Sequence, residues 1–314
     1  MKTSKIHIFT MAWNEPFTGW LARFALPSLY QPANVPALVA EGHRVTHHVF
    51  TIERDIPAIL EAGKACGASL TVQAFEAPAG TMLRQIQAAL LIGAAERAMA
   101  EDAIFVPAAA STIWANGSLA NVVHVCDETD CATAAIYLLA DAEKMAENLM
   151  IDPALRTGIS APDLASICFE TLHSGSRSTL NRDTSKAHLY GLGMMQLSPT
   201  LFALRNQVPS VAAVRFKPQD IALFRLENDF RCWDGPHWPG MLIREGRFTF
   251  LASSDQAFQV NLMRAGKMNL ANHAALHDAL GPMVDRRHAA RATIQAEAAR
   301  TYMASIRMSR GVTL

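Results

Sequence analysis

The sequence lacks the short motifs that identify several common enzyme classes. No G-x-G-x-x-G follows the first apolar segment, and neither G-x-x-x-x-G-K-[ST] nor G-x-S-x-G occurs. These absences argue against NAD-dependent oxidoreductases, P-loop NTPases and α/β-hydrolases, which need those glycines and nucleophiles at fixed spacing. The H-E-x-x-H spacing of zinc enzymes is also missing, so no metal site is predicted.

Cysteine and long apolar runs are scarce. The five cysteines include no C-x-x-C pair, which excludes zinc ribbons and dithiol redox motifs, and we interpret them as structural thiols in a reducing compartment. No uncharged run approaches the roughly 20 residues that cross a bilayer. The first nine residues show no secretory h-region. We therefore expect a cytoplasmic protein without a transmembrane segment.

Charge is sparse and balanced. Only 18% of the 314 residues are charged, Lys+Arg and Asp+Glu are 28 each, and half of the residues are hydrophobic. An ordered globule is expected, since a chain of this length can bury about 75% of the surface of its unfolded form. No net basic character points to a nucleic-acid partner.

What is present is an alternation of short apolar segments with helical stretches. Expected strands are Ile6–Phe9, Val45–Phe50, Leu70–Phe75, Ala103–Val106 and Ala134–Leu139. Expected helices between them are Thr18–Tyr30 (broken by Pro27), Ile56–Cys66, Thr81–Ala100 and one that begins near Ser118. This rhythm predicts an α/β fold with a mostly parallel, Rossmann-like sheet, which binds ligands at the carboxyl ends of its strands.

The second half of the chain is less regular. A helix over Ala161–Leu172 capped by Ser160, a polar loop after His173, and helices from Asn272 onward are expected. We predict a nucleotide-binding half over residues 1–155 and an α+β acceptor-side half over 156–314, which share one continuous core.

Three segments carry a family resemblance. Trp13-Asn14-Glu15-Pro16, the stretch Leu26–Leu38 (LPSLYQPANVPAL) and the stretch Trp114–Leu119 (WANGSL) stand in sequence order around the first four expected strands. Together they resemble a group of bacterial glycosyltransferase-like proteins, convincingly over residues 5–125. The resemblance implies a GT-A-like fold with a nucleotide-sugar donor at the carboxyl edge of the first strands.

One motif of that fold is missing. GT-A enzymes place a D-x-D after the fourth strand to hold a divalent metal, but Pro107–Thr112 reads PAAAST and offers no carboxylate. Either the enzyme is metal-independent, or the acids come from elsewhere, or the donor chemistry has been lost. No cofactor is predicted.

Candidate donor contacts lie at the ends of the expected strands. Trp13 would stack on the nucleobase and Asn14 would hydrogen-bond to it. A metal-free transferase also needs cations where the diphosphate leaves, which Arg177 of the polar loop would supply. The other predicted substrate-binding residues are Thr10, Thr51, Trp114, Asn116, Ser118 and His173. Each of these is also compatible with a purely structural role.

The candidate acceptor side is the loop 231–240. Its tryptophans Trp233 and Trp238 flank Asp234 and His237, and aromatic faces commonly stack on sugar rings. Asp234 or His237 would then be the general base that deprotonates the acceptor hydroxyl. A rigid packed turn is the competing interpretation of this loop.

Asp255 is the alternative general base. The acidic run Asp127–Asp130 is interpreted as a solvated turn away from the carboxyl edge, and the C-terminal arginines as a solvated helix face that leaves a homo-oligomer contact open. The favoured function is transfer of a sugar from a nucleotide sugar to a glycan or other hydroxyl acceptor. Two alternatives remain: a degenerate homologue that binds nucleotide or glycan without turnover, and another nucleotide-dependent α/β transferase such as a methyltransferase.

Overall fold

The structure is a computed structural model of the 314-residue chain. It describes residues 3–76, 81–151, 158–177, 192–206, 210–230, 233, 237–264 and 304–311. The helices expected from Asn272 onward lie outside these residues, as does most of the polar loop after Arg177.

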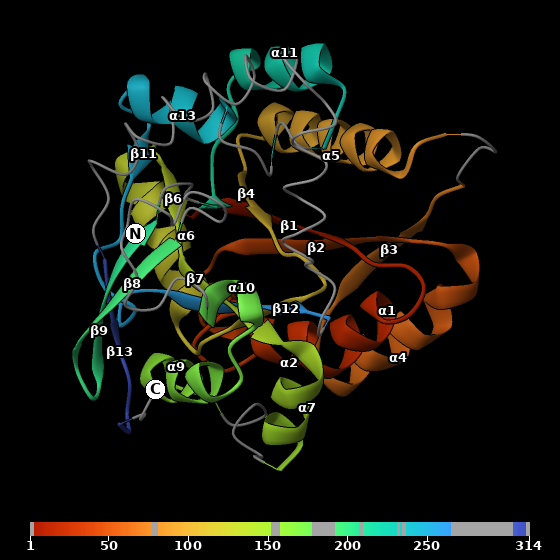
Figure 1. Ribbon diagram of the computed structural model, residues 1–314. Helices are drawn as coiled ribbons and strands as arrows, with labels where there is room; N and C mark the ends of the chain where they lie inside the picture. Colours follow the sequence, from red (N-terminus) through yellow and green to blue (C-terminus); the bar gives the residue numbers. More distant parts are fainter. Residues whose placement is uncertain are drawn as a thin grey trace, which may run out of the picture.

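A four-stranded parallel sheet forms the first half, in the order β3-β2-β1-β4 (Figure 1). Its strands are β1 (Lys5–Met11), β2 (Arg44–Thr51), β3 (Leu70–Ala74) and β4 (Ile104–Pro107). Every pair is parallel, with Ile8 opposite His47 on one side and Val106 on the other. The predicted Rossmann-like α/β fold class is confirmed.

The sheet continues beyond β4 into the second half of the chain. Phe105 and Val214 exchange two backbone hydrogen bonds of 2.7 and 3.0 Å in an antiparallel bridge. Val214 follows β10 (Val211–Ala213), which pairs antiparallel with β6 (Ala132–Ala134). β11 (Phe248–Thr249) then pairs parallel with β6, so β1, β2, β4, β6 and β11 run the same way.

One face of this sheet is covered by α5 (Leu83–Ala100), α11 (Pro218–Glu227) and α13 (His237–Arg244) (Figure 1). Phenylalanines of β1, β2 and β4 pack there on Leu91 of α5 and Phe224 of α11. The wholly apolar strand β4 suits this position because helices exclude water from both faces of the sheet.

The opposite face is covered by helices from the first βα units and by α6 (Ser118–Thr129). These helices are α1 (Phe17–Trp20), α2 (Leu26–Leu29), α3 (Val35–Ala40) and α4 (Ile56–Ala65). Ile6 and Ile8 of β1 pack on Leu38 of α3 and Leu119 of α6.

The expected helix break at Pro27 is wrong. A π-helical turn η1 (Leu21–Ala25) joins α1 to α2, and the amide of Leu26 donates to the carbonyl of Leu21. Proline has no amide hydrogen to donate and crowds the carbonyl four residues earlier. The wider turn just before Pro27 lets the helical path continue through it.

The second half adds shorter strands to the parallel core. β12 (Phe258–Met263) pairs parallel with β7 (Ile136–Asp141) and antiparallel with β5 (Thr112–Trp114). A separate antiparallel sheet has the order β13-β9-β8, with bounds Ala304–Arg307, Leu201–Asn206 and Leu192–Ser198. Strands that precede residue 155 in the sequence therefore pair with strands that follow it.

Three helices accompany these strands: α7 (Ala142–Ile151), α9 (Ala161–Glu170) and the short α10 (Ser174–Arg177). The predicted cap of α9 is confirmed, because the Ser160 hydroxyl accepts the Asp163 amide. α10 replaces the start of the loop that was expected after His173. Within the described residues, no helix has the length and apolar character needed to cross a membrane.

The described cysteines Cys66, Cys126, Cys131 and Cys168 form no disulfide bond. Burial raises the pKa of the Cys126 thiol to about 12 and also raises that of Cys168. Such thiols are protonated and unreactive at neutral pH, which suits a packing role.

Candidate functional site

The order of the parallel strands identifies one edge of the sheet as the candidate site. The chain moves outward from β1 to β2 and β3, then returns to place β4 on the other side of β1. The connections therefore leave in opposite directions at β1 and β4, which is the kind of position where open α/β sheets bind ligands. The loops after Met11 and Pro107 meet there, with Ala12 and Ala110 in one apolar cluster.

The turn after β1 has a conformation fixed by Asp55. Asn14 has a left-handed φ of 57°, and its amide donates to Asp55 Oδ2 at 2.7 Å. The Thr18 hydroxyl donates to the same oxygen at 3.0 Å, and Arg54 donates to the side-chain oxygen of Asn14. Asparagine tolerates this backbone region better than most residues. The turn therefore presents Trp13 at the carboxyl edge in a defined orientation.

Trp13 forms an aromatic pair with the residue after β3. Its ring meets that of Phe75 edge-on, with centroids 5.0 Å apart and an interplanar angle of 83°. Both rings are partly exposed. Aromatic rings stack on other flat groups, so this partly exposed pair is the candidate contact for a nucleobase.

The loop after β4 contributes small side chains and no acid. Ala109 is exposed between the buried Ala108 and Ala110. The acids of this edge instead follow the other strands, since Glu15, Glu53 and Glu76 are all exposed there. No group of three metal-ligating side chains forms among the described residues of this edge.

Thr10 and Thr51 lie beneath the edge and not on it, since both are fully buried. The Thr10 hydroxyl is 2.9 Å from Nε2 of His47, whose Nδ1 lies 3.3 Å from the Tyr30 hydroxyl. Burial, with a smaller contribution from His48, lowers the pKa of His47 to about 3. A neutral imidazole thus joins β1, β2 and the helical layer, and we assign both threonines to this buried layer.

The two longer segments that carry the family resemblance hold each other in place. Ser28 Oγ accepts the Trp114 amide at 3.0 Å, and Asn34 donates to the Ala115 carbonyl at 3.1 Å and accepts the Leu119 amide at 3.1 Å. Asn116 in turn accepts the Ala33 amide at 2.9 Å. The polar residues at these spacings thus join the turn before α3 to the start of α6.

Three predicted substrate contacts fall within this junction. Trp114 is 1% exposed in the apolar core, and Ser118 Oγ accepts the Phe258 amide at 2.9 Å. Asn116 is partly exposed but engaged with Ala33. We assign these three residues to the scaffold and leave them out of the proposed donor site.

The predicted acceptor loop is only partly described. Asp234 lies outside the described residues, as does the side chain of His237. Trp233 and Trp238 are 8% and 0% exposed, with ring centroids 4.6 Å apart, and they pack on Phe216 and Phe224 over the α5 face. Because these neighbours cover the rings, we assign both tryptophans to packing.

The remaining predicted residues are scattered around the second half. His173 is buried, and its amide donates to the Leu139 carbonyl at 3.0 Å. Arg177 is exposed at the end of α10. Asp255 precedes β12 and pairs with Arg307 at 3.5 Å. The described elements do not bring these three side chains together with Trp13.

The interpretation of Asp127–Asp130 as a solvated turn is correct only in part. Glu128, Thr129 and Asp130 are exposed, but the first three residues of the run belong to α6 and Asp127 is paired. Asp127 belongs to α6, and its carboxylate accepts the Ser4 hydroxyl at 2.8 Å and pairs with Arg215. Only 17% of the Asp127 side chain is exposed. The run does lie away from the carboxyl edge, because Ser4 precedes β1.

Sequence reasoning missed Asp55, Arg54 and Phe75 as neighbours of Trp13. Arg54 and Asp55 fall between the expected strand Val45–Phe50 and the expected helix Ile56–Cys66, but nothing in their residue types indicates that Asp55 holds the Asn14 turn. Phe75 was taken only as the apolar end of a strand. Contacts between separate βα loops have no local signature in a single sequence.

Comparison with known proteins adds little at this point. No family model and no curated protein matches the chain. Among solved structures, it is similar to a protein described as a glucose-1-phosphate thymidylyltransferase from Bacillus anthracis, solved in complex with sucrose. The identity is 12%, the match covers 79% of this chain and 86% of that one, and the TM-score is 0.36. No functional conclusion is drawn from so distant a likeness.

Proposed function

We propose that the chain is a glycosyltransferase that binds a nucleotide-sugar donor at the carboxyl edge of its parallel sheet. The observation that supports this proposal is the switch point between β1 and β4, beside which the half-buried Trp13 is held by the Asn14 turn. A nucleobase would stack on the Trp13–Phe75 pair, and the donor phosphates would extend toward the alanine loop after β4. Ala109 allows close approach to the backbone there.

The acceptor half of the reaction rests on the sequence. A general base is required to take the proton from the acceptor hydroxyl, and Asp234 and His237 stay the first candidates for that role, with Asp255 as the alternative. Arg177, exposed at the end of α10, is the candidate cation for the leaving diphosphate. In this proposal the donor diphosphate needs no metal, because Pro107–Thr112 offers no carboxylate.

The missing carboxylates after β4 also favour a second candidate, a homologue that binds nucleotide or glycan without turnover. Another nucleotide-dependent transferase, such as a methyltransferase, is the third, because a switch point alone does not specify the ligand.

The deciding experiment measures thermal shift and turnover in parallel. UDP-, GDP- and CMP-sugars are tested for a rise in melting temperature, with S-adenosylmethionine as the contrasting ligand, and those that bind are tested for sugar hydrolysis or transfer. We expect a rise with one nucleotide class and slow donor hydrolysis. Binding without hydrolysis or transfer would favour the second candidate, and a response to S-adenosylmethionine alone would exclude the glycosyltransferase proposal.

A further inference from the structure

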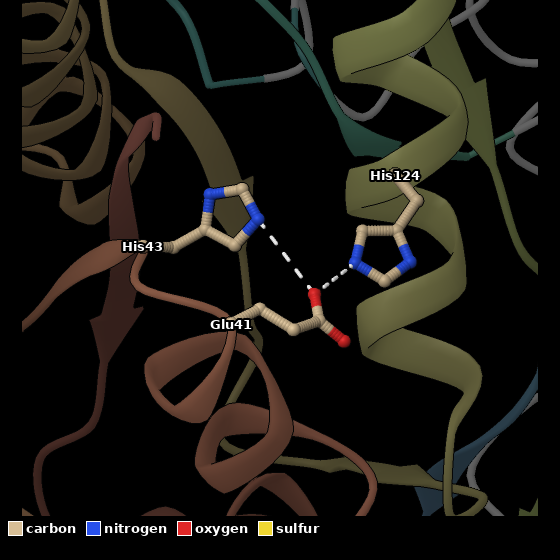
Figure 2. A group of neighbouring side chains, drawn as sticks. All are labelled: Glu41, His43 and His124. Carbon is tan, nitrogen blue, oxygen red and sulfur yellow. Dashed lines mark hydrogen bonds and ion pairs between the residues drawn. The ribbon is translucent and has the colours of Figure 1, made fainter. Parts of the chain in front are cut away.

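A second group of chemistry-bearing side chains lies at the opposite, amino edge of the sheet. Glu41 directly follows α3, His43 directly precedes β2, and His124 lies on α6 (Figure 2). Gly42, with a left-handed φ of 93°, forms the turn between the first two. The amide of His43 donates to the Leu38 carbonyl at 3.0 Å and closes this turn against α3.

The three side chains converge on one point. Glu41 Oε2 lies 2.6 Å from His124 Nε2 and 3.7 Å from His43 Nε2, and all three ligand atoms are within 4.8 Å of one another (Figure 2). Ligand atoms around a tetrahedral zinc ion, with bonds of about 2.0–2.2 Å, are separated by roughly 3.3–3.5 Å. Side-chain adjustments on the ångström scale would therefore place all three on one ion.

Of the three side chains, one is buried and the other two are accessible to solvent. His43 is almost buried, with 3% of its side chain exposed, whereas Glu41 and His124 are 29% and 30% exposed. An ion can therefore enter from the solvent side, and water can fill its remaining coordination position. Two imidazole nitrogens and one carboxylate oxygen form a donor set that suits zinc, copper and nickel better than magnesium or calcium.

We propose that Glu41, His43 and His124 bind a divalent transition-metal ion of the zinc class at the amino edge of the sheet. This site is separate from the proposed donor site, which lies at the carboxyl edge, and does not depend on the proposed function.

One contact limits the affinity of the site. In the unbound protein, Nδ1 of His43 accepts the Ser4 amide at 3.2 Å, so the proton of the neutral ring is on Nε2 and faces Glu41. A metal on Nε2 moves that proton to Nδ1 and breaks the hydrogen bond with Ser4. Metal-bound histidines normally donate from their second nitrogen, so the site gives up part of its binding energy. We expect an exchangeable ion with micromolar affinity and not a permanently bound cofactor.

The test titrates metal-stripped, full-length protein with zinc chloride by calorimetry, and with cobalt chloride by visible absorption. We expect a single strongest zinc site and a cobalt spectrum of four- or five-coordinate type with nitrogen ligands. His124→Ala and Glu41→Gln should each weaken zinc binding at least about tenfold, because even the partners of metal ligands are worth about 10–100-fold. Both residues are partly exposed, so both variants should fold.

The matched control is Glu101→Gln. Glu101 is also a glutamate of the amino edge beside a histidine, with its carboxylate 3.7 Å from His7 Nε2. This variant should keep the zinc affinity of the wild-type chain. The proposal is overturned if His124→Ala and Glu41→Gln bind zinc as tightly as the control, or if wild-type protein shows no zinc binding at micromolar concentration.

Discussion

The two edges of the parallel sheet are built from different contacts. The amino edge is closed by ion pairs between distant segments: Arg215 with Asp127, and Arg247 with Asp220 at 2.7 Å. Of the carboxylates in these two pairs, Asp220 is fully buried and Asp127 is 17% exposed. Among the described residues of the carboxyl edge, the corresponding pair is Arg54 with Asp55, and the Arg54 side chain is 72% exposed.

This difference separates the two edges. Long-range pairs at the amino edge join α6 and α11 to segments of the second half, and their burial stabilises that edge. The carboxyl edge instead uses local hydrogen bonds to hold one turn, and it leaves an aromatic pair, small side chains and exposed acids at the surface. Open α/β sheets in general bind their substrates and nucleotides at the carboxyl ends of the strands.

The largest expected effect lies at the amino edge, in Asp220→Ala. The Asp220 carboxylate accepts from Arg247 and from the Trp238 indole at 3.0 Å. Removing it leaves the largely buried guanidinium with only the Glu245 carboxylate, at 2.9 Å, and leaves the Trp238 N–H without its acceptor. Loss of one partner of a buried pair typically costs about 3–5 kcal/mol. Urea unfolding should show this loss, whereas nucleotide binding by the folded fraction should stay unchanged.

The matched control for this variant is Glu96→Gln, which removes an exposed ion pair with Arg225 on the α5 face. Exposed pairs contribute about 0–1 kcal/mol. If Asp220→Ala costs no more than the control, the buried pair is not what stabilises the amino edge.

Low pH should destabilise the protein through His47 and His48, two buried histidines of β2. Burial lowers the pKa of His47 to about 3 and that of His48 to about 4. Because these values lie below the ordinary 6.5, the unfolded chain binds protons first as the pH falls. Stability is therefore complete above about pH 6.5 and decreases toward pH 4, at about 1.4 kcal/mol per pH unit for each histidine once the pH is well below 6.5.

His48→Leu isolates one of these contributions. The ring of His48 meets that of His7, with Arg97 of α5 and Glu101, the residue after α5, nearby. Neither nitrogen of His48 has a hydrogen-bond partner among the described residues. Leucine removes the titration and the unsatisfied nitrogens together. Urea unfolding between pH 6 and pH 5 should then show a shallower dependence than in the wild-type chain. An unchanged slope would mean that His48 is not buried in its neutral form.

At the carboxyl edge, Trp13→Ala should remove on the order of 1–3 kcal/mol of nucleotide affinity, as aromatic–base stacking does in other proteins. Phe17→Ala is the control, because Phe17 is an exposed aromatic of the same segment. Isothermal titration with the nucleotide identified in the thermal screen measures both. Equal affinities of the two variants, or unfolding of Trp13→Ala, would return Trp13 to a structural role.

The smallest effect is expected from chelation. EDTA should change nucleotide affinity less than tenfold, even where it strips zinc from the amino edge, because the loop after β4 has no carboxylate. Titration of the same protein before and after chelation provides the measurement. A larger loss would indicate that Glu15, Glu53 or Glu76, which follow the neighbouring strands, assemble a metal site with the donor.

The sequence by itself determined the layered core. Short, mostly apolar segments separated by helical stretches predict buried parallel strands, and Ala103–Val106, which has no polar residue, is the clearest of them because a strand covered on both faces needs no polar alternation. The α9 cap at Ser160 was also predictable, since capping depends on residues three positions apart. The helical path through Pro27 was not, because the π-turn that admits it extends over the preceding residues.

Tertiary structure decided which polar residues are available for chemistry. By residue type alone, a tryptophan is equally suited to ligand binding and to packing. Only the folded sheet and the helices on its faces place Trp114, Trp233 and Trp238 in the core. Two of the contacts described above join segments that are far apart in the sequence. Asp55 lies beside Asn14, and Glu41 and His43 lie beside His124, up to 83 residues away. A single sequence records local periodicity, whereas such contacts depend on how the whole chain folds back on itself.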